Sequence, residues 1–187
     1  MTVLVLGPNG SGKSVYAEKL AMRLSTGALY YIATMIPWGE EGQSRIDKHR
    51  KRRENMDFIT AEQPTDISGM KFPPDAVVLL EDVSNLLSNV MFAGSRSGSA
   101  DSVFADIKTL CAKRRAAVLV SIEGLTNEPA YDDETRGYID ALNQLNENLS
   151  GFADVVVTMR DGRPVFVKGE LSLNTTEDRF LSKVNRR

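Results

Sequence analysis

The chain has 187 residues, of which 42% are hydrophobic and 26% are charged, and its formal net charge at pH 7 is −2. This is the composition of a globular protein, and the small net charge argues against the basic surface of a duplex-binding protein. The single cysteine, Cys111, excludes an intramolecular disulfide framework and a cysteine-based zinc site. No apolar run reaches the about 18 residues of a membrane span, and a glycine-rich turn follows Leu6, so we expect a cytoplasmic protein with neither a membrane span nor a signal peptide.

Apolar segments with strand character alternate with segments of helical periodicity along the chain. We predict strands at 2–6, 28–34, 57–62, 75–82 and 116–124, followed by a terminal hairpin of 154–159 and 164–169. Helices are predicted at 15–24, from about residue 43, at 85–92, at 101–115 with Asp101 as its cap, and at 133–149. Because the strands are apolar throughout, we expect an α/β fold with a mainly parallel sheet, helices on both faces and a C-terminal hairpin.

The polar residues of the predicted sheet are gathered where its strands end. In parallel sheets, ligands bind beyond the carboxyl ends of the strands. Those ends carry a glycine-rich loop, Thr34, the pair Glu81–Asp82, and Glu123. With no linker and no internal repeat, residues 1–187 are expected to form one domain around this edge, with a polar tail from about residue 169.

The glycine-rich loop matches the phosphate-binding pattern G-x-x-x-x-G-K-[ST] without exception. Its residues are Gly7, Pro8, Asn9, Gly10, Ser11, Gly12, Lys13 and Ser14. The pattern stands between a predicted strand and a predicted helix, which is the context that it requires. Backbone N–H groups would surround the phosphate oxygens, Lys13 would reach the β and γ phosphates, and the Ser14 hydroxyl would hold Mg²⁺. The loop therefore predicts a P-loop NTPase-like domain that binds a nucleoside triphosphate.

The only histidine of the chain, His49, lies in a strongly basic segment. In residues 45–53, six of the nine side chains are Lys or Arg. The segment has three interpretations: a solvated helix face, an RNA-binding patch, or an imidazole that attacks an α-phosphorus among phosphate-binding cations. The segment alone does not choose among them.

Four carboxylates at strand ends are further candidates. Glu81 closes an apolar strand, where P-loop proteins place an acid near Mg²⁺ or its water shell, and the adjacent Asp82 is able to substitute for it. Glu62 and Glu123 are either capping or solvent-facing acids, or groups that select guanine by accepting hydrogen bonds from its N1–H and 2-amino groups.

The succession of motifs resembles the bifunctional adenosylcobinamide kinase/adenosylcobinamide-phosphate guanylyltransferase family of cobalamin assembly. In order, the chain shows LVLGPNGSGKS, YIAT, RIDKH followed by Arg, TAE, LLE, and LSGFAD near its end, over about residues 2–168. The chain departs from the family pattern at Gly10, Asp82, the SIEG segment and Glu147.

The resemblance implies a two-step enzyme with a P-loop fold, usually a trimer. Such an enzyme phosphorylates adenosylcobinamide with ATP or GTP in the presence of Mg²⁺, and then moves GMP from GTP to the product through a guanylylated histidine, here His49. The implied nucleotide contacts are the phosphate loop with its catalytic Lys13, the strand end of Ala33, Thr34 and Met35, the basic residues Arg50, Lys51, Arg52 and Arg53, and the acids Glu62 and Glu81.

Two other functions are compatible with the residues. One is a P-loop kinase for another small alcohol, with His49 as a bystander. The other is a nucleotide-dependent regulatory or nucleic-acid-binding protein that uses the basic segment, although the resemblance implies no nucleic-acid partner.

Overall fold

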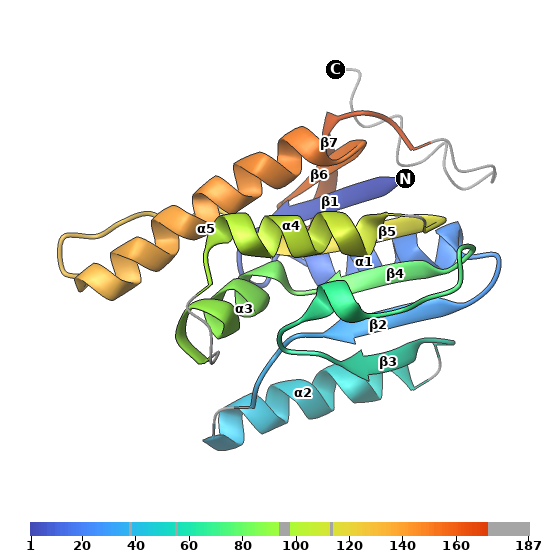
Figure 1. Ribbon diagram of the computed structural model, residues 1–187, viewed down its shortest axis with the longest axis horizontal. Coiled ribbons are helices and arrows are strands. Elements are labelled where there is room, and N and C mark those ends of the chain that lie inside the picture. The colour runs from blue at the N-terminus through green and yellow to red at the C-terminus, as the bar shows by residue number, and fades with distance from the viewer. Residues whose placement is uncertain (38, 55, 94–97, 113, 172–187) are drawn as a thin grey trace.

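The computed structural model describes residues 1–37, 39–54, 56–93, 98–112 and 114–171. In these residues a seven-stranded sheet has the strand order β3-β2-β4-β5-β1-β6-β7 (Figure 1). Its strands are β1 (Thr2–Gly7), β2 (Leu29–Ala33), β3 (Ile59–Glu62), β4 (Val77–Glu81), β5 (Ala116–Ile122), β6 (Val155–Arg160) and β7 (Arg163–Lys168). All neighbouring pairs are parallel except the β6–β7 hairpin, so the predicted α/β fold is confirmed.

Helices cover both faces of the sheet, as its apolar strands require. They are α1 (Lys13–Leu24), α2 (Gly39–Arg53), α3 (Val83–Ser88), α4 (Ala100–Cys111) and α5 (Asp133–Phe152), with a 3₁₀ turn η1 (Ile67–Gly69) and a π-helical turn η2 (Asn89–Ala93). In Figure 1, α4 lies in front of the sheet and α1 behind it.

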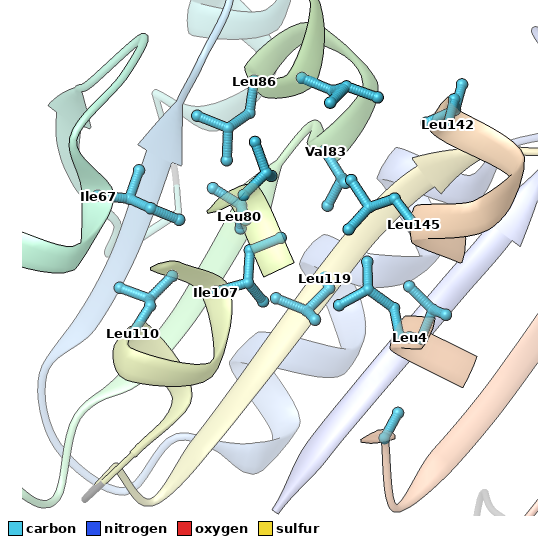
Figure 2. Packing of buried hydrophobic residues seen from close by; sticks show 14 of the residues in the cluster. Leu4, Ile67, Leu80, Val83, Leu86, Ile107, Leu110, Leu119, Leu142 and Leu145 are labelled. Carbon is cyan, nitrogen blue, oxygen red and sulfur yellow. The ribbon is translucent and has the colours of Figure 1, made fainter. Parts of the chain in front are cut away.

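Side chains of one strand alternate between two buried clusters because successive residues point to opposite faces. In β1, Leu4 faces the cluster of α3, α4 and α5, whereas Val5 faces the cluster of α1. Figure 2 shows the first cluster, in which Leu80 and Leu119 of the sheet meet Ile107 of α4. The sheet is thereby covered by helices on both faces, while its carboxyl edge is not covered by either cluster.

Several element boundaries differ from the prediction. The fourth helix begins at Ala100, and its cap is Ser99 rather than Asp101: Ser99 Oγ accepts from the Ser102 N–H (3.3 Å), and Ser102 Oγ accepts from the Ser99 N–H (2.9 Å). This reciprocal pair satisfies two helix-end donors and leaves Asp101 in the first turn. The basic helix α2 begins earlier than predicted, at Gly39.

The segment predicted as one helix at 85–92 consists of α3 followed by η2. It begins directly after β4, because the Asp82 carboxylate accepts from the Asn85 N–H (3.0 Å) and caps α3. Of the predicted loop at 94–100, residues 94–97 lie outside the described part of the chain, as does the predicted tail from residue 172 onward. Among the described residues, no helix has the length and apolar character needed to cross a membrane.

Candidate functional site

The phosphate loop turns sharply between β1 and α1. Gly10 and Gly12 have φ angles of 74° and 84°, in the left-handed region that side-chain-bearing residues rarely adopt. Gly12 is the N-terminal cap residue of α1, so the first N–H groups of the helix open onto the loop. Lys13 is buried, and its Nζ donates to the Pro8 carbonyl (3.3 Å). The loop thus places a cation and free helix-end donors together, which is an anion-binding arrangement.

Ser14 and Glu81 connect the phosphate loop to β4. The Ser14 hydroxyl donates to Glu81 Oε1 at 2.6 Å, and Glu81 Oε2 is buried with no hydrogen-bond partner among the described residues. Burial, and then the charge of Asp82, raise the pKa of Glu81 from an ordinary 4.5 to about 8, against the hydrogen bond from Ser14. Glu81 is therefore mostly protonated at neutral pH, and a cation bound beside it would favour its ionised form. A hydroxyl and a carboxylate oxygen are the hard ligands that Mg²⁺ takes, so these residues fit the expected metal.

Thr34 fastens β2 to the turn after β4 instead of lining the site. Its fully buried hydroxyl lies 2.8 Å from the Asp82 carbonyl oxygen, and its Oγ1 accepts from the Asp82 N–H (2.8 Å). Asn89 Nδ2 donates to the Thr34 carbonyl (2.7 Å) from the other side. The residues before and after Thr34 line the site, so a ligand at this strand end would meet Ala33 and Met35.

These elements enclose a cleft of about 710 Å³ at the carboxyl edge of the sheet. This volume lies within the range of small-molecule sites. The predicted residues that line it are Asn9, Gly10, Gly12, Lys13, Ser14, Ala33, Met35, Arg50, Arg53, Glu62 and Glu81. Among the described residues predicted as contacts, Gly7, Pro8, Ser11, Thr34 and Lys51 do not line the cleft.

The basic helix α2 contributes two arginines to the cleft. Arg50 pairs with Glu62 at the end of β3, and both side chains are half-exposed or more. Arg53 is buried with its guanidinium 3.5 Å from the ring centroid of Tyr31, and its Nε and Nη1 have no hydrogen-bond partner in the described chain. His49 lies in the same helix, but its side chain and that of Arg52 fall outside the described part of the structure.

The cleft also contains residues that sequence reasoning missed or noted only in passing. They are Val15, Tyr31, Ile46, Thr60, Ser84, Asn85, Ile122, Leu125 and Tyr138, together with Asp82, which the sequence offered only as a substitute for Glu81. Most are apolar or sit inside predicted elements, where nothing local separates a cleft residue from a core residue. Glu123 is not among the lining residues; partial burial raises its pKa, and Arg160 opposes that rise.

The strand β1, its glycine loop and a helix that starts with Lys-Ser, together with an acid at the end of β4, one strand beyond the neighbouring β5, define a P-loop protein of the α/β class. Solved structures share this fold. The flagellar accessory protein FlaH from Methanocaldococcus jannaschii matches with a TM-score of 0.54 and 12% identity over 93% of this chain and 80% of that chain. A second solved structure, an ATPase domain, matches with a TM-score of 0.53 and 13% identity over 90% of this chain and 76% of that one.

Within this class the chain belongs to the cobinamide kinase / cobinamide phosphate guanyltransferase family, CobU. The family model matches residues 3–167, which include every strand of the sheet apart from its outermost residues. No curated protein sequence matches the chain. The motif resemblance is therefore confirmed, and with it a place among transferases of cobalamin biosynthesis.

Proposed function

We propose that this protein phosphorylates the side-chain hydroxyl of adenosylcobinamide with a nucleoside triphosphate, and then transfers GMP from GTP to that phosphate through His49. The observation that carries the proposal is the shared cleft: the phosphate loop with Glu81 forms one wall, and Arg50 and Arg53 of the histidine-bearing helix form another. Family membership supports the choice of substrate.

In the kinase step, the acceptor hydroxyl oxygen bonds to the γ-phosphorus and its proton is released to water. The bond from that phosphorus to the β–γ bridging oxygen breaks, and the nucleoside diphosphate leaves. Lys13 and the N–H groups of the loop stabilise the negative charge that spreads over the phosphoryl oxygens. Ser14 and Glu81 would hold Mg²⁺, directly or through water, and bound Mg²⁺ supplies charge neutralisation at the phosphates. Glu81 Oε2, which has no hydrogen-bond partner among the described residues, supports this assignment.

In the guanylyl step, an imidazole nitrogen of His49 attacks the α-phosphorus, and pyrophosphate leaves. The acceptor phosphate then displaces the imidazole, so that the P–N bond breaks and a new pyrophosphate linkage forms. Position 49 is three residues after Ile46 and four before Arg53, both of which line the cleft, and residues at these spacings share a helix face. The buried Arg53 guanidinium, with N–H groups lacking described partners, suits the phosphate oxygens of the nucleotide.

The test separates the two steps. Wild type, Lys13→Ala and His49→Ala are each incubated with GTP, and intact mass is measured for a covalent GMP that is acid-labile and alkali-stable. Phosphorylation of adenosylcobinamide by ATP is measured in parallel. We expect the adduct in wild type only, with kinase activity retained in His49→Ala and lost by more than about 100-fold in Lys13→Ala, because removal of a charge at the transferring phosphoryl costs several kcal/mol.

Lys19→Ala is the matched control, because Lys19 is an exposed lysine of α1 outside the cleft. An adduct that persists in His49→Ala would remove His49 as the nucleophile. An adduct without any phosphorylation of the corrinoid in wild type would leave a nucleotidyltransferase with another acceptor. Kinase activity on other alcohols, with no adduct, would identify a simple P-loop kinase.

A further inference from the structure

One wall of the cleft has no part in the nucleotide contacts proposed above. It is built by the turn from β4 into α3, the end of β5 with the loop that follows, and the N-terminal half of α5. Its lining residues are Asp82, Ser84, Asn85, Ile122, Leu125 and Tyr138.

One corner of this wall is polar and leaves a hydrogen-bond acceptor unused. Asp82 Oδ1 accepts from the Asn85 N–H (3.0 Å) and from the Ser84 hydroxyl. No described residue donates to Oδ2 of the same carboxylate. Asp82 is half-buried and lines the cleft, so Oδ2 is available to a hydroxyl or amine in the cavity.

The rest of the wall is apolar and held in place. The Tyr138 hydroxyl donates to the Ser84 carbonyl (3.1 Å), which ties α5 to the start of α3. Burial, and then the charge of Asp82, raise the pKa of Tyr138 to about 12, so this hydroxyl stays protonated at physiological pH. Leu125 and Ile122 lie on the same wall, and Phe92, about half-exposed, contacts Tyr138 with ring centroids 6.1 Å apart.

The polar corner adjoins the place where the phosphoryl group would react. Glu81, the residue before Asp82, holds the Ser14 hydroxyl of the phosphate loop at 2.6 Å. Among the other lining residues, Arg50, Arg53 and Glu62 carry the features that suit a nucleotide. The remaining wall is therefore the one from which a second substrate would approach the γ-phosphate.

We infer that this wall is the acceptor subsite: Asp82 Oδ2 accepts a hydrogen bond from the hydroxyl to be phosphorylated, and Leu125, Ile122 and the Tyr138 ring pack against the short aliphatic arm that carries it. This inference rests on the proposed function and adds to it the place where the second substrate binds. A hydrogen bond to Asp82 orients the hydroxyl oxygen with its lone pair toward the γ-phosphorus. The large ring system of the corrinoid would remain outside the cleft, near Phe92.

Asp82→Asn tests the hydrogen bond without removing the helix cap. Asn is as good a cap residue as Asp, and its Oδ1 replaces the oxygen that caps α3. Its Nδ2 then stands where Oδ2 stood, so an acceptor becomes a donor. We expect the KM for adenosylcobinamide to rise about tenfold, while the KM for ATP stays within about twofold. Asp101→Asn is the matched control, since it removes a carboxylate from the first turn of α4, outside the cleft.

Leu125→Ala tests the apolar part, with Val167→Ala on the outer strand β7 as its control. We expect a roughly three- to tenfold rise in the acceptor KM for Leu125→Ala and none for the control, whose side chain is 62% exposed. Thermal melts of each variant verify the fold.

The outcomes distinguish a failure of the proposed function from a failure of the acceptor subsite alone. Wild type that transfers nothing to adenosylcobinamide overturns the proposed function, and this subsite with it. Active wild type with an unchanged acceptor KM in Asp82→Asn overturns the subsite alone. A rise confined to the KM for ATP, or to the Mg²⁺ concentration that gives half-maximal rate, would place Asp82 with the nucleotide and also overturn it.

Discussion

Glu81 is a carboxyl group that the folded protein holds in its protonated form up to about pH 8. The unfolded chain ionises the same group near pH 4.5. Between these values the folded state binds one proton more than the unfolded state, so the free energy of unfolding falls as the pH rises. The burial of Glu81 thus destabilises the nucleotide-free protein increasingly as the pH rises from about 4.5 to about 8.

Glu81→Gln should remove this pH dependence, because the amide cannot ionise. We expect the variant to gain more than about 1.4 kcal/mol over wild type between pH 5 and pH 8, the equivalent of one pKa unit. Thermal melts of the nucleotide-free proteins across this range measure the effect. Glu128→Gln is the control, because it replaces an exposed glutamate outside the cleft. Parallel curves for wild type and Glu81→Gln would show that Glu81 titrates normally.

At the scale of elements, η2 and β2 are joined by one buried side chain. Asn89 Nδ2 donates to the Thr34 carbonyl (2.7 Å) and to the Pro64 carbonyl (3.1 Å). The amide thereby holds the end of β2, the loop before η1 and the turn after α3 in one arrangement. Ala33 and Met35 line the cleft at this point, so these two hydrogen bonds of Asn89 also help to position the residues of the site.

Asn89→Ala removes both hydrogen bonds and leaves two carbonyl groups without their donor. We expect a loss of about 2–3 kcal/mol in the free energy of unfolding, measured by urea denaturation, and a higher KM for nucleotide. Asn143→Ala is the control, because Asn143 is exposed and its amide makes only a long contact of 3.4 Å with the Leu125 carbonyl. A loss in the free energy of unfolding equal to that of the control would mean that the two hydrogen bonds of Asn89 contribute nothing to stability.

At the scale of the whole molecule, stability is concentrated in the central strands. β4, β5 and β1 are buried on both faces, whereas the outer strand β3 is largely exposed and the outer strand β7 contains no buried residue. The site lies at the carboxyl edge of those central strands, so the most deeply buried strands of the fold support the phosphate loop and Glu81.

Leu119→Ala should therefore cost about 2–5 kcal/mol in the free energy of unfolding, because it leaves a cavity between β5 and the helices of the first cluster (Figure 2). Val167→Ala on β7 should change stability by less than about 0.5 kcal/mol, since that side chain is exposed. Urea denaturation of both variants makes the comparison. Equal losses would contradict a stability gradient from the centre to the edge of the sheet.

The features that the sequence determined by itself are those whose cause is local. The phosphate loop is a contiguous strand, turn and helix, and its glycines and Lys13 act through groups only a few residues apart. The apolar strands predicted a mainly parallel sheet, because burial on both faces leaves no polar alternation. Glu81 stood out as a charge that ends an apolar run. Each of these could be recognised without knowledge of strand order.

The tertiary structure decided which side chains share the cleft. Arg50 meets Glu62 across 12 residues, and Tyr138 meets Ser84 across 54, and neither spacing follows from a local pattern. The strand order places β2 beside β4, so the Thr34 hydroxyl bonds to the backbone at the end of β4. Its neighbours Ala33 and Met35 line the cleft instead. The acceptor wall depends on how α3 and α5 pack, and packing arises from contacts between residues distant in sequence.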